Sequence, residues 1–180
     1  MHTFKVHFSL NKNHSLYLDQ WVKFAIASGT EYLELNFREA DVATFMPKMF
    51  YEFPFQLFSD GKESFLKHLH LTCCSLKPPP NFDGFCYLKE LVLDEVSIND
   101  IGVLNVLCSC FVLESLTLRS CQQLVYLVIA HPSFKLQCLN VYGCPNFKTV
   151  KFFKVSIGII LGRRQDLQAR IQRSLKHHFS

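Results

Sequence analysis

Apolar residues recur along the chain in a fixed frame. Four segments carry leucine or valine at relative positions 0, 3 and 5 and a buryable residue at position 8. The four sets are Leu66, Leu69, Leu71 and Cys74; Leu88, Leu91, Leu93 and Val96; Leu113, Leu116, Leu118 and Cys121; Leu136, Leu139, Val141 and Cys144. Successive frames begin 22, 25 and 23 residues apart. A less complete copy upstream has Leu33 and Leu35 in the middle positions and Thr30 at the first.

The spacing predicts a short strand in every frame, because positions 3 and 5 alternate with mostly polar neighbours. One such unit cannot bury its apolar side, so several must stack. The predicted fold is α/β: a leucine-rich-repeat solenoid with a short parallel sheet on its concave face and a convex face of mixed helix, strand and loop. The predicted strands are Leu33–Leu35, Leu69–Leu71, Leu91–Leu93, Leu116–Leu118 and Leu139–Val141. Cys74, Cys121 and Cys144 are expected as buried free thiols at the corner that follows each strand.

The segments between frames indicate what covers the convex side. Two half-period copies of the frame predict further strands: Leu124, Leu127 and Ile129, then Phe147, Val150 and Phe152. A helix is predicted where apolar residues recur at steps of three and four, capped by Asn99 or Asp100: Ile98, Ile101, Leu104, Leu107, Cys108 and Phe111.

A second helix is predicted over Leu16–Ser28, with Ser15 as its cap and Gly29 as its stop. We expect Trp21 to be buried on its apolar face, against the first repeat.

The lead-in Phe4-Lys5-Val6-His7-Phe8-Ser9-Leu10 is followed by Leu18-Asp19-Gln20-Trp21-Val22 and Tyr32-Leu33-Glu34-Leu35. Together with Leu113-Glu114-Ser115-Leu116-Thr117-Leu118 and Leu139-Asn140-Val141-Tyr142-Gly143-Cys144-Pro145, these residues resemble plant F-box/LRR proteins of the type that often carries an FBD region. The resemblance covers residues 3–152. It implies a substrate receptor of a cullin-based (SCF-type) ubiquitin ligase, whose repeats bind the protein to be marked. The F-box that docks a Skp-type adaptor opens with a Leu-Pro step, which this sequence lacks, so a Skp-type adaptor is a doubtful partner.

Charge divides the chain into two parts. Residues 1–155 are expected to form the repeat domain, with residues 1–29 as an N-terminal strand and helix that lead into the repeats. Residues 156–180 form a basic C-terminal extension with five basic residues and one acid. In this extension Leu167, Ile171 and Leu175 lie four apart, which is typical of an amphipathic helix. That helix would bind a membrane surface or an acidic partner. Alternatively, it is a terminal extension that frays or covers the open end of the repeats, and we favour this terminal extension.

Composition narrows the class of protein. Hydrophobic residues make up 49% of the chain and charged residues 19%, which excludes intrinsic disorder. No apolar run is long enough to span a membrane. Residues 1–155 are electrically neutral, which argues against nucleic acid as a partner. Eight cysteines without a signal peptide favour a reducing compartment, hence a cytoplasmic or nuclear location.

The sequence contains no nucleophile motif and no phosphate-binding glycine loop. His68 and His70 alternate on one strand near Cys73 and Cys74, but a pair of solvent-facing histidines is the better interpretation than a metal site. We therefore expect no catalytic residue, no metal and no cofactor, and we do not expect an enzyme.

The interleaved residues of the strands point away from the core and form the candidate protein-binding surface. They are Glu34, Asn36, His70, Thr72, Asp94, Thr117, Arg119, Asn140 and Tyr142. Arg119 and Asp94 occupy the same position in adjacent frames, so we expect them to interact. The function hypothesis is a protein-binding module that recognises substrates. The alternative is an F-box-less repeat fragment that acts as a structural or competitive binding protein without a ligase role.

Overall fold

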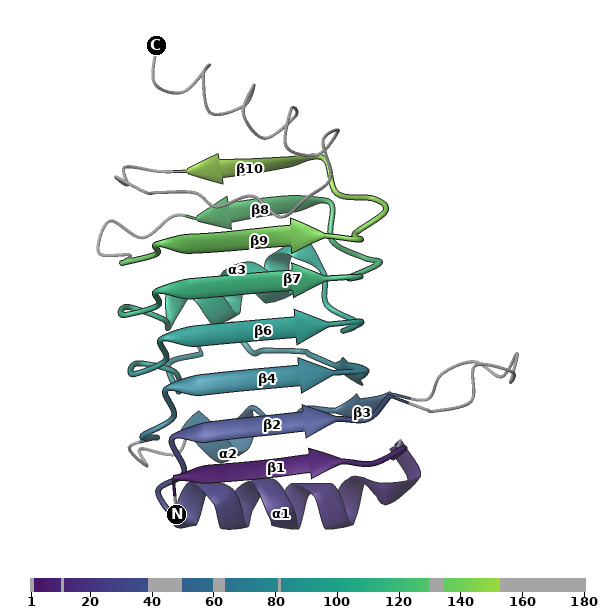
Figure 1. The fold of residues 1–180 in the computed structure, drawn as a ribbon, viewed down its shortest axis with the longest axis vertical. Coiled ribbons are helices and arrows are strands. Elements are labelled where there is room, and N and C mark those ends of the chain that lie inside the picture. The colour runs from purple at the N-terminus through teal and green to yellow at the C-terminus, as the bar shows by residue number, and fades with distance from the viewer. Residues whose placement is uncertain are drawn as a thin grey trace.

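The computed structural model describes residues 2–10, 12–38, 50–59, 64–80, 82–129 and 135–152. Its main feature is a six-stranded sheet in which all neighbouring strands are parallel (Figure 1). The strands, in their order across the sheet, are β1 (Thr3–His7), β2 (Tyr32–Asn36), β4 (His68–Thr72), β6 (Glu90–Asp94), β7 (Ser115–Arg119) and β9 (Cys138–Tyr142). The five strands predicted from the leucine frame are therefore confirmed, and the N-terminal strand adds a sixth.

The register of the sheet follows the sequence frame without a slip. Equivalent frame positions stand side by side, so that Leu91, for example, pairs with Leu69 on one side and Leu116 on the other. The two resulting columns, which we call the leucine ladder, are at most 2% exposed: Leu33, Leu69, Leu91, Leu116 and Leu139; Leu35, Leu71, Leu93, Leu118 and Val141. Each strand thus buries one side against the interior and leaves the other side, the open face, for the interleaved residues.

A left-handed residue ends four of the strands. The positions directly after β4, β6, β7 and β9 have φ values between 53° and 68°: Cys73, Glu95, Ser120 and Gly143. Only Gly143 is of the type that adopts this conformation without strain. The backbone N–H of Cys73 donates to the Asp94 carbonyl at 3.0 Å, which holds the bend in register with the next strand.

The cysteine predicted at each corner follows this left-handed residue. Cys74 and Cys121 are 0% exposed and Cys144 is 7% exposed, so their predicted burial is confirmed. All eight cysteines of the chain are free thiols.

A second layer covers the core side of the sheet with mixed elements. It contains β3 (Tyr51–Glu52) paired with β5 (Cys74–Ser75), and β8 (Tyr126–Ile129) paired with β10 (Thr149–Phe152). The strands β8 and β10 run opposite to the main sheet in Figure 1, because the chain returns along this layer. The half-period frames correctly predicted β8 and β10. The helical elements are η1 (Lys12–His14), α1 (Ser15–Ala27), α2 (Gln56–Ser59) and α3 (Asp100–Cys108).

Helix α3 confirms the predicted cap and corrects the predicted face. The Asn99 side chain accepts a hydrogen bond from the Gly102 N–H at 2.8 Å. Val103, Val106 and Leu107 are buried, whereas Ile101 is 67% exposed. Apolar residues surround this helix almost completely, so their spacing alone did not identify the buried side.

Helix α1 differs from the prediction at its start and on its surface. It begins at Ser15 with His14 as the N-cap residue, and the Ser15 hydroxyl donates to the Lys12 carbonyl instead of capping. Leu18, Val22 and Ala25 are buried. Trp21 is 41% exposed, so the prediction that it packs under the first repeat is wrong. It lies at the margin of the buried stripe formed by Leu18, Val22 and Ala25.

A cluster of aromatic rings, absent from our sequence prediction, fills the second layer near β2 and β4. We call it the phenylalanine cluster; its members are at most 4% exposed: Phe37, Tyr51, Phe53, Phe55, Phe58, Phe82 and Phe85. Neighbouring ring centroids lie 4.8–6.5 Å apart. Gly84 allows this approach, because a Cβ atom there would come within 2.7 Å of the Phe58 backbone oxygen.

The predicted basic extension, residues 156–180, lies outside the described residues, as does the proposed amphipathic helix of Leu167, Ile171 and Leu175. The division of the chain at residue 155 therefore stays a prediction. Within the described ranges, no helix is long and apolar enough to cross a membrane.

Candidate functional site

The open face carries all nine predicted binding residues, and the sheet register arranges them in two adjacent columns. Glu34, His70, Thr117 and Asn140 stand in the middle column. Asn36, Thr72, Asp94, Arg119 and Tyr142 form the next column, near the ends of the strands. The structure thus brings the nine residues onto one surface. Their role in binding remains a prediction.

The strand-end column is organised around Asp94. Its Oδ2 accepts hydrogen bonds from Arg119 Nη1 at 3.3 Å and from Arg38 Nη2 at 3.0 Å. Asp94 is only 7% exposed, and a carboxylate so removed from water needs such cationic partners. The expected contact between Arg119 and Asp94 is therefore present in the structure, but Asp94 is a buried anchor rather than an exposed surface acid.

Arg119 is held from a second side. Its Nε donates to the Tyr142 hydroxyl, and its guanidinium lies 4.8 Å from the centre of the Tyr142 ring. Two anchors fix a long side chain that would otherwise sample many rotamers. Arg119 nevertheless remains 44% exposed, so part of its guanidinium faces solvent.

Arg38 is a site residue that the sequence analysis missed. Besides Asp94 it contacts Glu95 Oε1 at 3.0 Å, and its backbone N–H donates to Asn36 Oδ1. The sequence does set Arg38 apart, because it stands at position 8 of the incomplete frame that begins at Thr30. A charged residue there departs from the buried Cys or Val of the other frames.

The open face over β1, β2, β4 and β6 is a network of acids, histidines and one tyrosine. Glu34 contacts Lys5 Nζ at 3.0 Å and His7 Nε2 at 2.7 Å. The Tyr32 hydroxyl donates to Glu34 Oε2 at 2.9 Å and also lies 2.9 Å from His70 Nδ1. Lys5 and His7 were not predicted on this surface, because β1 carries no complete leucine frame.

Glu90 closes this network on the β6 side. Its carboxylate lies 3.0 Å from His68 Nδ1 and 3.3 Å from His70 Nε2. Partial burial raises the pKa of Glu90, but hydrogen bonds from His68 and His70 outweigh this effect, so that the pKa of Glu90 is lowered on balance. Burial and the hydrogen bond to Glu34 raise the pKa of Tyr32 to about 12. Most polar groups in this part of the surface therefore pair with one another.

The two histidines turn to Glu90 and not to a shared metal position. In the described part of the chain, no group of three or more His, Cys, Asp or Glu side chains is arranged to hold a metal ion.

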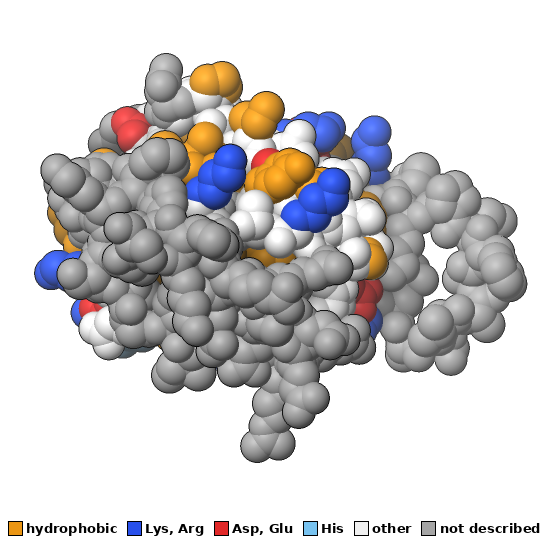
Figure 2. Space-filling model, turned by 90° about the horizontal axis from the view of Figure 1, so that it is seen from above, with side chains coloured by type: hydrophobic (Ala, Val, Ile, Leu, Met, Phe, Trp, Pro, Cys, Tyr) orange, Lys and Arg blue, Asp and Glu red, His pale blue; other side chains and the backbone are white. Residues whose placement is uncertain are grey.

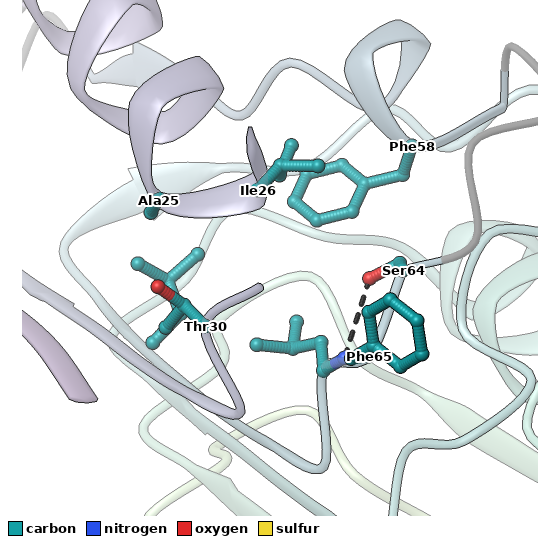
Figure 3. A pocket seen from close by; sticks show the side chains of 8 residues that line it. Ala25, Ile26, Thr30, Phe58, Ser64 and Phe65 are labelled. Atoms are coloured by element: carbon teal, nitrogen blue, oxygen red, sulfur yellow. Dashed lines mark hydrogen bonds between the residues drawn. The ribbon is translucent and has the colours of Figure 1, made fainter. Parts of the chain in front are cut away.

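A small pocket beside α1 is a second candidate site, shown in Figure 3. It encloses about 230 Å³ of empty space, some of it open to solvent. This volume is below the 300–1,000 Å³ that is usual for a ligand site. It is lined by Ala25, Ile26, Thr30, Leu33, Phe58, Ser64, Phe65 and Leu66. The Thr30 hydroxyl is buried there without a hydrogen-bond partner. We interpret the pocket as a packing gap, which leaves the open face as the candidate site.

Comparison with known proteins agrees with this architecture. The family model described as "At1g61320/AtMIF1, LRR domain" matches residues 1–175. The chain belongs to this leucine-rich-repeat family. Leucine-rich-repeat domains are typically protein-interaction modules without catalytic activity.

A curated relative extends the comparison to F-box proteins. The chain is 29% identical over 113 residues to the F-box/FBD/LRR-repeat protein At1g13570 of Arabidopsis thaliana. The match covers 63% of this leucine-rich-repeat chain and 24% of the relative, about a quarter of its length. The resemblance to the repeat portion of plant F-box/LRR proteins is thus confirmed. No solved structure matches the chain.

Proposed function

We propose that the open face of the sheet binds a protein partner and that Arg119 anchors it. The observation that carries this proposal is the fixed position of Arg119 between Asp94 and the Tyr142 ring. Arginine and tyrosine dominate the binding energy of many protein interfaces, and a side chain already held in place loses little entropy on binding.

We further propose that the repeats coil as a solenoid with the open face on its concave side, and that this face recognises substrates of a ubiquitin ligase. The name of the Arabidopsis relative and the family match support that role. The alternative is a repeat protein that binds the same partner without recruiting a ligase. The eight free thiols support a cytoplasmic or nuclear location. We propose no catalytic function, in keeping with a sequence that contains no nucleophile motif and no phosphate-binding glycine loop.

The test of the binding surface is affinity capture of interacting proteins from a plant extract, with wild type and variants. Arg119→Gln removes the charge without placing an acid beside Asp94, and Arg119→Glu reverses it. Both should weaken partner binding by about 1 kcal/mol or more, the range of an anchor residue. The matched control is Lys151→Glu, which changes an exposed charge on β10 in the second layer.

Arg173→Glu, in the basic extension, completes the set and should leave binding nearly unchanged. Melting curves of all variants verify that the fold survives. If the Arg119 variants keep every partner while Arg173→Glu loses them, the extension is the binding element and the open face is not.

Capture with a purified Skp-type adaptor separates the two roles. Stoichiometric binding would support a ligase receptor, whereas partner binding without adaptor binding would support the competitive repeat protein.

A further inference from the structure

The exposed guanidinium of Arg119 has hydrogen-bond donors left for a ligand. Its Nε donates to the Tyr142 hydroxyl and its Nη1 donates to Asp94. In the part of the chain that the structure describes, the remaining nitrogen, Nη2, has no acceptor. Every guanidinium nitrogen of this kind carries N–H groups and no lone pair to offer, so Nη2 can bind only an acceptor.

Two hydroxyl groups beside Arg119 are available as donors as well. The Tyr142 hydroxyl accepts from Arg119, and the Thr117 hydroxyl accepts from Asn140 Nδ2 at 3.3 Å. Each hydroxyl also has a proton of its own, and neither donates it to another described residue. Thr117 precedes Arg119 by two positions on β7, and Tyr142 pairs with Arg119 across β7 and β9. We call Arg119, Thr117 and Tyr142 the donor cluster.

Cations and anions alternate in a row that ends at the donor cluster. Arg119 contacts Asp94, which also contacts Arg38, and Arg38 in turn contacts Glu95. Arg119 is therefore the cationic end of the row, and the Asp94 side chain beside it is only 10% exposed. The open-face residues of the next strand, β9, carry no charge: Cys138, Asn140 and Tyr142.

Figure 2 views the molecule from the end at which β9 and β10 lie, and basic side chains lie there among apolar ones. An anion that approaches the donor cluster from this end therefore meets the cation of the row before its acids.

We propose that the bound partner places an oxyanion in the donor cluster, either the carboxylate of an acidic side chain or a phosphate group on a side chain. Such a group offers acceptors alone, and its negative charge strengthens each hydrogen bond that it receives. The planar guanidinium of Arg119 also matches the geometry of carboxylate and phosphate oxygens. A lysine or arginine of the partner would add donors where acceptors are missing, so it is disfavoured. The inference rests on the proposed function, because it names the chemistry that Arg119 recognises in a partner.

An NMR titration of the full chain tests the donor cluster with small probes. The acidic probes are N-acetyl-phosphoserine amide and N-acetyl-glutamate amide, and N-acetyl-glutamine amide is the neutral control. The side-chain Nε–H signal of Arg119 should shift with an acidic probe and saturate at millimolar concentration, whereas the glutamine probe should leave it unchanged. The acidic probe that binds more tightly identifies the source of the oxyanion.

Thr117→Val and Tyr142→Phe each remove one donor while the charge of the cluster stays the same. Each should weaken binding of the acidic probe by about threefold or more, because hydrogen bonds to a charged group are strong. Thr117→Val is the cleaner test, since Tyr142→Phe also frees Nε of Arg119. Tyr126→Phe is the matched control and should leave binding unchanged. Tyr126 is also exposed beside a cation, with Lys148 Nζ 5.9 Å from the centre of its ring, but it lies on β8 in the second layer.

Three results would overturn the oxyanion contact: no shift of Arg119 with either acidic probe, an equal shift with the glutamine probe, or an affinity that Thr117→Val leaves unchanged. The proposed function has a separate readout. If Arg119→Gln still loses the partners captured from a plant extract, the binding surface stands without an oxyanion. If Arg119→Gln keeps every partner, the proposed function itself fails.

Discussion

The leucine ladder and the phenylalanine cluster are two solutions to the same problem of burying apolar surface. In the ladder, each residue lies beside the same type of residue from the next repeat, as Leu116 lies between Leu91 and Leu139. In the cluster, rings from distant segments meet at varied angles: Phe53 and Phe58 stack at 20°, whereas Phe82 and Phe85 meet edge to face at 81°. The ladder repeats one leucine-to-leucine contact from strand to strand, whereas each ring-to-ring contact in the cluster has its own geometry.

This difference has an energetic consequence. A gap in the ladder is bordered by flexible leucines that can move into it. A gap in the cluster is bordered by rigid rings, and the close approach at Gly84 leaves their backbones little freedom. We therefore expect the cluster to tolerate truncation less well than the ladder.

Native-state thiol labelling gives the largest predicted effect and compares the two regions directly. Cys74 pairs with Tyr51 of the phenylalanine cluster across β5 and β3, whereas Cys121 lies behind the ladder at the end of β7. Both should react at least about a thousandfold more slowly than an exposed thiol, because labelling requires an opening that costs several kcal/mol. Burial also raises the pKa of Cys74, which leaves little reactive thiolate.

Peptide mass spectrometry of the labelled protein measures each rate separately. Exposed Cys86 and Cys108 are the internal references for a fast reaction. If the cluster is the more rigid region, Cys74 should react later than Cys121. Reaction of Cys121 or Cys144 as fast as Cys86 would contradict their burial.

Phe85→Ala should have the largest effect on stability. Phe85 is 1% exposed, and its ring lies within 4.8–6.5 Å of the rings of Phe53, Phe55, Phe58 and Phe82. We expect a loss of about 3–5 kcal/mol in the free energy of unfolding, measured by urea denaturation. Tyr87→Ala, at a neighbouring aromatic that is 50% exposed, should change it by about 0.5 kcal/mol or less. Equal losses at the two positions would refute the role of the cluster.

Leu116→Ala tests the ladder by the same measurement. Leu116 is 0% exposed, and its truncation should cost about 2–5 kcal/mol. We expect a smaller loss than for Phe85→Ala, because Leu91 and Leu139 can relax into the space. Ser115→Ala, on the open face of the same strand, controls for changes in strand propensity. An unchanged thermal midpoint for Leu116→Ala would contradict the ladder.

The two regions also differ in how far the sequence predicts them. The ladder was predictable because strand alternation and repeat length impose two periods that the leucines obey. The phenylalanine cluster has no period: its residues come from separate connections, and only the three-dimensional path of the chain brings them together. Trp21 was misplaced for a related reason, since a residue at the margin of a helical stripe is buried or exposed according to what lies opposite.

The candidate site shows the same division. The contact of Asp94 with Arg119 followed from the frame, because equal positions in adjacent repeats become neighbours in a parallel sheet. Arg38 escaped prediction, because its side chain reaches Asp94 across β4 from the end of another strand. Lys5 and His7 escaped because the pairing of β1 with β2 was not evident from the leucine pattern.

Thr30 lies where the two regions meet, and its substitution gives the smallest predicted effect. It holds the first position of its frame, which is leucine in the other four, and it borders the pocket that also contacts Phe58 (Figure 3). Thr30 is 4% exposed, and its buried hydroxyl has no hydrogen-bond partner. Replacing an unsatisfied buried hydroxyl with a methyl group of similar shape removes a desolvation cost, so Thr30→Val should stabilise the protein by about 1 kcal/mol. Thr72→Val is the control, because Thr72 lies half-buried on the open face and should give a change near zero. If Thr30→Val lowers the urea midpoint, the hydroxyl is satisfied in solution, and the first frame uses a polar contact where the other four frames have leucine.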